Sequence, residues 1–553
     1  MTYELERHLV LIETASNQRF IYDTNKLRDN IGASQLLHLA TTAWIEGVIK
    51  DEAKGISVEW VVQLSGKAIL LVPDRDIAKR IITAVTLRAL KQAPGMVLRG
   101  VIGDKPLDLD KMTSEQFHEE LKALFAEHER LGADLPSPDA RFQRLPVVAP
   151  CGRSGLPASH PIRYSSEANT IEPVSAPSNA KEAFSKPGWK RIVGSIQEYA
   201  PALTFHKNVT EMETANEAMD WVGLIHADGN GLGRLFLNFD EHVGPDEPAG
   251  VYIERYRDFS RALDDCTRKA FAGALAALDA RRGAEPGKPL PVVPMVLGGD
   301  DLTALCDGTM AVRLAADYVT RFMDATAAHE DIQKVWKGPL GVCAGVSLVK
   351  PHYPHHAAYE LACDLLESAK GGKRVFRRGD KILPFAALDV HVHLDSSGDD
   401  LGLVRERHRS RDGEAALTVR PFVVRAPDDA DLDVRARNWA KVRGWDWLER
   451  VMPVMPRGGG DFDRDARLPN SVLHDLCAAA QDGVNVANAR LCAVLGREHK
   501  DASARVENAW ARLLDSTDPR TASLFVPLPD DGPDGLKRAA RLPDALDLMD
   551  FWR

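Results

Sequence analysis

Residues 292–306 read VVPMVLGGDDLTALC, an apolar stretch on each side of a Gly-Gly-Asp-Asp tip. Two apolar runs joined by a short turn that contains glycine are typical of a β-hairpin. In the tip, Gly298 and Gly299 allow the backbone to approach another group closely. Because the adjacent carboxylates of Asp300 and Asp301 repel each other and lose hydration beside apolar strands, a counter-charge is expected. Oxygen ligands suit Mg²⁺ or Mn²⁺, so the tip predicts a metal site.

A third carboxylate comes from residues 221–233, WVGLIHADGNGLG, which form an apolar strand that ends at Asp228 and a Gly-rich turn. A strand that ends in Asp, followed later by a hairpin with an acidic tip, is the layout of a polymerase or nucleotidyl-cyclase palm. Metal ions held by such carboxylates activate a 3′-hydroxyl and stabilise the leaving pyrophosphate. Backbone amides of the turn, which starts with Gly229 and Asn230, are expected to approach a triphosphate. The alternative is an ordinary surface hairpin, because Gly and Asp are common in turns.

The composition is that of a soluble protein, with 44% hydrophobic and 27% charged residues among 553. A chain of this length is expected to form three or four domains. Its apolar runs are too short for a membrane span, and its start lacks the basic and apolar regions of a signal peptide. Seven cysteines without a C-x-x-C pair suit a reducing cytoplasm and argue against a disulfide framework or a complete zinc site. With a net charge of −10, any surface that binds nucleic acid must be locally basic.

The first part of the chain, residues 1–105, predicts an α/β unit. Its hairpin, at residues 58–72, takes the place that the acidic hairpin has in the second half, but its tip is Ser65-Gly66-Lys67 and carries no acid pair. The two halves therefore resemble a duplicated β-α-β-β-α-β palm in which only the second copy has carboxylates. We expect an α+β fold with two ferredoxin-like palm domains of the polymerase or GGDEF-cyclase type.

Two further segments complete the predicted organisation. Residues 106–215 predict a helix near 112–133 and then a Pro-, Ser- and Ala-rich stretch, 134–190, that reads as loop with little regular structure. Within it, CGRSGLPA at 151–158 has the turn chemistry of a zinc knuckle, but one thiol cannot hold zinc, so we expect no zinc. Residues 401–553 predict a mostly helical C-terminal domain. The predicted domains are residues 1–105, 106–215, 216–400 and 401–553.

Short motifs follow one another along the chain in the order KLRDNIGAS, CGRSGLPA, ADGNGLG, GGDD, KPHYP, AYELACDLLESAKGGKR, LTVRPF and LPNSVLHDL. This ordered set resembles one family, the large, polymerase-like subunit of type III CRISPR effector complexes, here the Cas-ten family (the large subunit of Cmr and Csm complexes). GGDD alone is a weak signal, whereas the order of the whole set is specific. The resemblance covers nearly the whole chain.

The resemblance implies two facing palm domains, an intervening domain and a C-terminal helical domain. It implies a nucleotidyltransferase that joins ATP through 3′–5′ linkages into cyclic oligoadenylates, a second messenger of antiviral defence. The implied cofactors are two Mg²⁺ or Mn²⁺ ions, with ATP as substrate. The implied activator is target RNA paired with the guide RNA of the complex, whose backbone and small subunits are the other partners, in the cytoplasm.

The resemblance also assigns site residues. Asp228, Asp300 and Asp301 are the implied catalytic metal ligands, and Gly298 and Gly299 shape the hairpin.

Two sets of nucleotide contacts are implied as well. Lys370, Lys373 and Arg374, after a long helix, fit contacts to a triphosphate; the alternative is favourable charge at a helix C-terminus. The tip residues of the first hairpin are expected to touch the second nucleotide, and the alternative is a plain hairpin turn. Those tip residues are Ser65, Gly66 and Lys67.

Two departures from the family pattern matter. Many members begin with an HD nuclease domain, whereas this chain starts directly at the first palm, so we expect no HD nuclease and no DNA cleavage. The pair His474-Asp475 lies in a predicted helix without companion histidines and reads as helix surface. In the zinc-knuckle element, Ser154 stands where a second Cys is expected.

Other functions remain open from the residues alone. A diguanylate-cyclase-like enzyme is expected to carry GGDEF and a sensor, whereas this chain has GGDDL and a second palm. A template-directed polymerase or primase and a stand-alone cyclic nucleotide synthase share the same carboxylates. A non-catalytic scaffold in a ribonucleoprotein has no reason to keep repelling carboxylates together.

Overall fold

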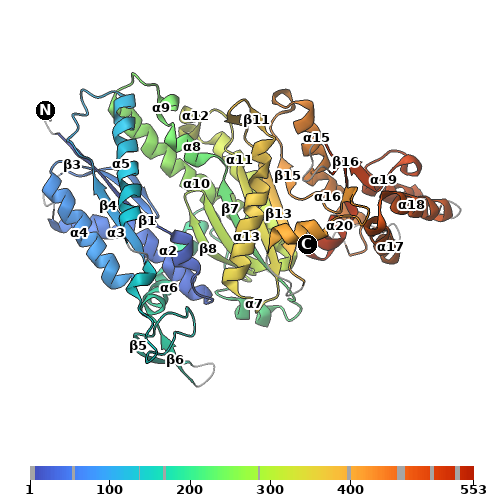
Figure 1. The fold of residues 1–553 in the computed structure, drawn as a ribbon, viewed down its shortest axis with the longest axis horizontal. Helices are drawn as coiled ribbons and strands as arrows, with labels where there is room; N and C mark the ends of the chain where they lie inside the picture. Colours follow the sequence, from blue (N-terminus) through green and yellow to red (C-terminus); the bar gives the residue numbers. More distant parts are fainter. Residues whose placement is uncertain are drawn as a thin grey trace.

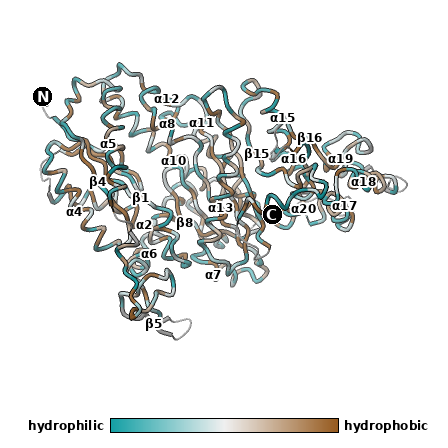
Figure 2. The backbone as a smooth tube through the Cα atoms, in the orientation of Figure 1, coloured by the Kyte–Doolittle hydropathy of each residue, from teal (hydrophilic) through white to brown (hydrophobic). Residues whose placement is uncertain are grey.

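The computed structural model describes residues 6–552 except 53–56, 136–137, 166–169, 284–286, 395–399, 458–466, 499–503 and 530–535. Along the long axis of the molecule lie a first sheet (blue), a second sheet (green to yellow) and a C-terminal region (orange to red), whose last helix, α20, returns toward the second sheet (Figure 1). Apolar residues concentrate along the strands of the sheets (Figure 2). Among the described residues, no helix is both long and apolar enough to cross a membrane.

The first sheet has four strands in the order β2-β3-β1-β4, and all neighbours are antiparallel. With helices between β1 and β2 and between β3 and β4, this is the ferredoxin-like topology that the sequence predicts. The apolar run of β1 is buried on both faces, from Leu9 to Ile12. The elements are β1 (His8–Ala15), α1 (Asn17–Tyr22), α2 (Leu27–Thr41), α3 (Ala43–Glu52), β2 (Glu59–Leu64), β3 (Lys67–Val72), α4 (Arg75–Gln92) and β4 (Val97–Ile102).

The second sheet repeats this topology and extends it. Strands β10-β7-β9-β8 have the same order as the four strands of the first sheet, and β13 and β15 add to the β10 edge. The predicted palm-type α+β fold is therefore confirmed. Strand β15 (Phe422–Arg425) lies beyond the predicted boundary at residue 400.

The helices and strands of the second palm continue to β13. They are β7 (Val222–Gly229), α8 (Leu232–Leu237), α9 (Asp240–Val243), α10 (Ala249–Arg282), β8 (Val292–Gly298), β9 (Asp301–Asp307), α11 (Gly308–Ala328), α12 (Glu330–Val335), β10 (Val342–Val349), α13 (His355–Lys370), the 3₁₀ turn η2 (Gly371–Arg374), β11 (Arg377–Arg378), β12 (Lys381–Ile382) and β13 (Ala386–Val392).

The prediction of little regular structure at 134–190 is wrong, because this stretch contains a hairpin and most of a long helix. Helix α6 starts where Ser175 accepts a hydrogen bond from Ser178 N, and it packs closely along α2. A methyl group added at Gly32 would lie 1.7 Å from the carbonyl oxygen of Lys181. The stabilising contact comes from a helix far away in the chain, so the local composition does not reveal it. The elements are α5 (Ser114–Asp134), β5 (His160–Ser165), β6 (Thr170–Val174), α6 (Ala176–Gln197) and α7 (Val209–Ala215).

The zinc-knuckle element is held by ion pairs. Arg153 is buried and lies within 3.2 Å of the carboxylates of Asp29, Glu172 and Glu182. The guanidinium joins α2, β6 and α6, while the thiol of Cys151 is free and buried. A buried cationic side chain thus ties the zinc-knuckle element to its neighbours through ion pairs.

The C-terminal region is mostly helical, as predicted, and also contains a small sheet of order β14-β17-β16 that the sequence does not indicate. The elements are α14 (Leu401–Arg407), β14 (Ala415–Ala416), α15 (Val434–Val442), α16 (Trp445–Val451), α17 (Asn470–Asp482), α18 (Val484–Glu498), α19 (Ala504–Leu514), β16 (Phe525–Pro527), β17 (Arg538–Ala540) and α20 (Leu542–Leu548).

Candidate active site

The register of the second sheet brings two of the predicted carboxylates side by side. Strands β7 and β9 pair as far as Ala227 and Leu302, and the next residues along each strand are Asp228 and Asp301. Because side chains alternate between the faces of a strand, both carboxylates are directed to the face that α13 covers. Asp300 sits at the tip, where its Oδ2 lies 2.9 Å from the position of a methyl group added at Gly229.

Helix α10 fixes the backbone of the tip. Gly299 has a positive φ of 63°, which favours glycine. Its N–H donates to Asp264 Oδ1 at 2.8 Å, and its carbonyl accepts from Thr267 Oγ1 at 2.7 Å. Sequence reasoning missed Asp264 and Thr267, because they lie far from the hairpin in sequence. Their spacing on one face of a helix is the only local signal that the chain offers.

The acids of the site are buried and close enough to raise one another's pKa values. Burial, together with the charges of Asp228 and Asp301, holds the pKa of Asp300 well above its usual range. Burial and then the charge of Asp228 raise the pKa of Asp301 to about 7, although Lys370 opposes the shift. Protonation therefore costs less here than in water, and a bound cation would relieve the same repulsion.

Lys370 is the cation that the chain itself supplies. Its Nζ donates to Asp228 Oδ2 at 2.6 Å and lies 3.2 Å from Glu367. Burial lowers the pKa of Lys370, but these two carboxylates outweigh burial and raise it. Asp228, Lys370 and Asp301 thus form one charge cluster at the end of α13.

The acids of the site are candidate ligands for a divalent ion. Among the described residues, no three His, Cys, Asp or Glu side chains are already arranged to hold a metal ion. One oxygen of Asp228 is occupied by Lys370, whereas Asp300 has a raised pKa and a position within hydrogen-bond reach of Asp228. Carboxylate oxygens with uncompensated charge are the ligands that Mg²⁺ and Mn²⁺ prefer, so the chemistry of the set fits such an ion.

The two hairpin tips face each other. A methyl group added at Gly298 would lie 3.9 Å from Cβ of Ser65, so the tip of the first palm is adjacent to the tip that carries the carboxylates. Gly66 has φ of 88°, and its N–H donates to Thr41 Oγ1 at 2.9 Å. The side chain of Lys67 is directed toward β1 and α5. Its Nζ lies 3.0 Å from Glu13 and over the ring of Phe125.

The remaining predicted nucleotide contacts differ in direction. Asn230 donates from Nδ2 to the carbonyl of Phe385 at 3.3 Å, so its side chain holds the turn after β7 against the sheet. Lys373 is half-buried, and burial together with the charge of Lys370 lowers its pKa. Arg374 is exposed at the end of η2. Of the three predicted phosphate-binding cations, Lys370 therefore lies by the carboxylates and Lys373 lies near Lys370. Arg374 is exposed to solvent.

A buried aromatic contact joins the palms behind the carboxylates, and sequence reasoning missed it. His226 lies two residues before Asp228, and its Nδ1 is 3.1 Å from Thr303 Oγ1. Burial lowers the pKa of His226 to about 4, so the ring is neutral near pH 7. The Nε2 of His226 lies 3.5 Å from the hydroxyl of Tyr359, whose ring stacks on Tyr22 of the first palm with centroids 3.5 Å apart.

Residues 221–376 match the family model described as Cas10/Cmr2, second palm domain. No curated protein sequence matches the chain. A Csm1–Csm4 subcomplex of the type III-A CRISPR-Csm interference complex aligns over 91% of this chain and 69% of that chain, with TM-score 0.50 and 13% identity. A Csm1–Csm4 cassette in complex with one ATP gives the same values.

An apo Csm1–Csm4 cassette aligns over 93% of this chain with TM-score 0.48 and 12% identity. The present chain spans 66% of the length of that chain, slightly under two thirds. At these identities, the structural likeness concerns the fold.

Proposed function

Because this chain is Cas10-like and carries the second palm domain of that family, we propose that it is a nucleotidyltransferase that joins ATP into 3′–5′ oligoadenylates in type III CRISPR defence. One observation carries the proposal. The matched segment, 221–376, contains all three acids, and the fold brings the end of β7, with Asp228, beside the hairpin tip, where burial and the neighbouring carboxylates raise the pKa values of Asp300 and Asp301. The solved structure with one ATP, which shares the fold, supports ATP as the substrate.

In the proposed reaction, Asp228, Asp300 and Asp301 would hold divalent ions. Such ions would supply Lewis-acid chemistry, which lowers the pKa of a 3′-hydroxyl and stabilises a leaving pyrophosphate. The chain contributes position and charge: the glycines of the tip admit a triphosphate close to the backbone, and no side-chain nucleophile is needed.

Lys370 has two roles in this scheme. Without ligand, its ammonium neutralises Asp228 at 2.6 Å. With a triphosphate bound, the same ammonium would bind the phosphate oxygens, and the Asp228 oxygen would then be available as a ligand. Arg374, which is exposed, adds a second contact from η2. Ser65, at the facing tip, is placed to touch the nucleotide that supplies the 3′-hydroxyl.

The partners proposed are guide RNA, target RNA and the other subunits of a type III effector complex. The support is the match to the Csm1–Csm4 subcomplex, whose description names such a complex. Activation by paired target RNA belongs to the same proposal.

The test is incubation of the purified chain with Mg²⁺ or Mn²⁺ and each NTP, with products identified by mass spectrometry. Oligoadenylates that disappear in Asp300→Ala and persist in Asp110→Ala, an exposed control, would support the proposal. Products from GTP alone would favour a diguanylate-cyclase-like enzyme, and template-dependent extension would favour a polymerase. If the chain stays inactive with co-purified subunits and paired RNA, it is a scaffold and the proposal fails.

A further inference from the structure

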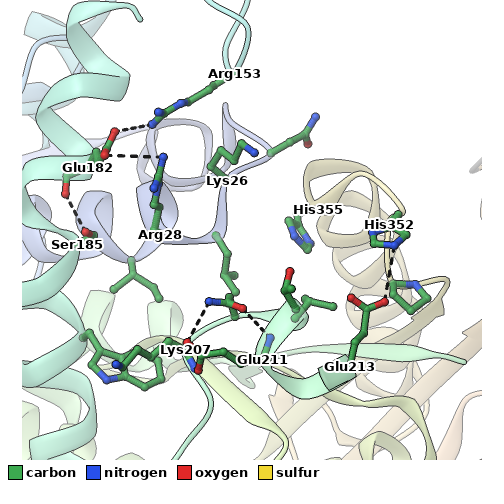
Figure 3. Close-up of a pocket in the computed structure, with 18 of the residues that line it drawn as sticks. Lys26, Arg28, Arg153, Glu182, Ser185, Lys207, Glu211, Glu213, His352 and His355 are labelled. Carbon is green, nitrogen blue, oxygen red and sulfur yellow. Dashed lines mark hydrogen bonds and ion pairs between the residues drawn. The ribbon is translucent and has the colours of Figure 1, made fainter. Parts of the chain in front are cut away.

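A cavity of about 1200 Å³ lies where the first palm, α6, α7 and the loop after β10 meet (Figure 3). It is not the site of the carboxylates. Cys343 of β10 pairs with Asp228, whereas Val349, at the other end of β10, precedes the lining loop at 351–355. Six strand residues at about 3.3 Å each place this loop about 20 Å from Asp228.

The cavity is basic in a protein whose net charge is −10. Six Lys and Arg side chains line it against four Glu, an excess of two positive charges before the histidines are counted. The four carboxylates are already engaged. Glu172 and Glu182 pair with Arg153, and Glu211 accepts from the backbone N–H of Lys207. Glu213 lies 3.7 Å from His352. None of these four carboxylates makes an ion pair with a lysine of the cavity, although the charge of Lys26 acts on Glu172.

Four lysines of the lining make no ion pair with a described residue: Lys26, Lys186, Lys190 and Lys207. They come from separate elements, namely the start of α2, helix α6 and the segment before α7. All four are exposed, and Figure 3 shows Lys26 and Lys207 on different walls around one space. Unpaired cations gathered in a concave surface attract a polyanion, because each contact releases a condensed counterion.

The lining also offers aromatic surface. Trp189 lies on α6 between Lys186 and Lys190 and is partly exposed. Tyr353 also lines the cavity, and its ring lies beside that of His393, with centroids 4.8 Å apart. Rings flanked by cations are the arrangement with which proteins bind single strands, since bases stack on the ring while cations track the phosphates. A duplex offers no free base faces for such stacking.

We propose that this cavity binds a segment of single-stranded nucleic acid, with its phosphates along the four lysines and a base on Trp189. The volume exceeds the range of about 300–1000 Å³ typical of small-molecule pockets, and the lysines are spread over several walls instead of converging on one point. A free nucleotide would leave most of them without a partner. The proposal gives a location for the RNA partner named above and is independent of the proposed catalysis.

The test measures fluorescence anisotropy of labelled single strands of about eight nucleotides, one RNA and one DNA of the same sequence, with the full chain. The variant that removes the four lysines of the cavity, called here the groove variant, is Lys26→Ala/Lys186→Ala/Lys190→Ala/Lys207→Ala. The matched control, Lys50→Ala/Lys91→Ala/Lys269→Ala/Lys337→Ala, makes the same change of net charge with exposed lysines outside the cavity.

The groove variant should lose affinity at least about tenfold, and the slope of log K against log salt should become shallower by about 3, because each lost phosphate contact contributes about 0.7. The control should stay within about twofold of the wild type. Trp189→Leu, which keeps an apolar side chain, should weaken binding about tenfold without changing the slope.

Equal losses of affinity for the labelled strands in the groove variant and in the control would overturn the proposal. A wild-type protein that does not bind the strands at low salt would overturn it as well. Competition by ATP as strong as by the unlabelled strand would assign the cavity to a free nucleotide and overturn it too. Asp300→Ala should abolish synthesis and leave strand binding unchanged, so a failure of this proposal is distinguishable from a failure of the proposed function.

Discussion

The Nζ of Lys370 donates a hydrogen bond to Asp228 Oδ2 at 2.6 Å, across the gap between the end of helix α13 and the end of strand β7. This contact neutralises the carboxylate at the end of β7, beside the hairpin tip where Asp300 and Asp301 have raised pKa values. The ammonium of Lys370 therefore occupies a position at Asp228 that the proposed function gives to a metal ion.

Lys370→Met separates these two roles. Charge-assisted hydrogen bonds contribute about 1.5–3 kcal/mol, so loss of the ammonium should raise KM for ATP about tenfold or more. The same variant should bind Mn²⁺ more tightly in the absence of nucleotide, because Asp228 loses its competitor. Steady-state kinetics and Mn²⁺ titration check the two effects. Lys337→Met, at an exposed lysine, should change neither; a variant that weakens Mn²⁺ binding would contradict this account of Lys370.

Stability without metal should depend on pH through Asp301. Its pKa is about 7 in the folded protein and near 4 when unfolded, so the folded state binds the extra proton between these values. The free energy of unfolding should therefore fall as pH rises from about 4 to 7, since its slope follows the protons bound by the unfolded minus the folded state. Thermal melts in EDTA should show Asp301→Asn more stable than the wild type at pH 8 and equal to it near pH 4.

Mg²⁺ provides the control for that prediction. It should raise Tm of the wild type at pH 8 and have a smaller effect on Asp301→Asn. The contrary outcome is a Tm that rises between pH 5 and 7 in EDTA for both the wild type and Asp301→Asn. It would show that groups other than Asp301 dominate the pH dependence of stability.

Removal of Arg153 should be strongly destabilising. It is buried, and its loss leaves Asp29 without its main counter-charge in a buried position. Breaking a buried ion pair by removing one partner costs about 3–5 kcal/mol, so Arg153→Met should lower the urea midpoint markedly. Burial raises the pKa of Asp29 to about 6, although the charge of Arg153 opposes this shift. Because Asp29 becomes neutral below pH 6, the stability lost in Arg153→Met should be smaller there.

The control for this variant is Arg28→Met. Arg28 has a side chain 52% exposed and lies 3.7 Å from Glu182, so its ion pair is screened by water. We expect a change of under about 1 kcal/mol. Equal losses for Arg28→Met and Arg153→Met would mean that burial does not set the energy of this cluster.

The contact between α2 and α6 predicts a third stability effect. Gly32→Ala places a methyl group 1.7 Å from the carbonyl oxygen of Lys181, so the helices must separate. Overpacking of this kind costs about 1–3 kcal/mol or more. Gly47 lies in α3, and a methyl group added there would meet no atom within 4 Å. Gly47→Ala should therefore stabilise the folded protein by up to about 1 kcal/mol. Urea unfolding of both variants checks the prediction, and a neutral Gly32→Ala would show that the helices are free to move apart.

The strands of both palms could be read from the sequence because each is a short apolar run next to a turn with its own chemistry. The hairpins with tips Ser65-Gly66-Lys67 and Gly298-Gly299-Asp300-Asp301 carry the signal within a few residues. Helix α6 could not be read in the same way, because Pro187 and its neighbours resemble a loop and its stability comes from α2.

The site shows the same division. Asp228, Asp300 and Asp301 stand out locally as acids at strand ends, and their catalytic role remains a prediction. Asp264, Thr267 and Tyr22 do not stand out, because each acts on a partner distant in the chain. The orientation of Lys67 toward Glu13 and of Asn230 toward Phe385 also depends on what the folded chain places nearby.

The sequence by itself therefore determined the α+β class, the duplicated palm and the acidic tip, since turn chemistry and alternating burial act between near neighbours. Only the tertiary structure decided that Lys370 neutralises Asp228, that Arg153 joins three segments, and that four lysines from three parts of the chain gather in one cavity. The physical reason is that charge–charge energies and burial depend on distances in space, and those distances exist only once the chain has folded.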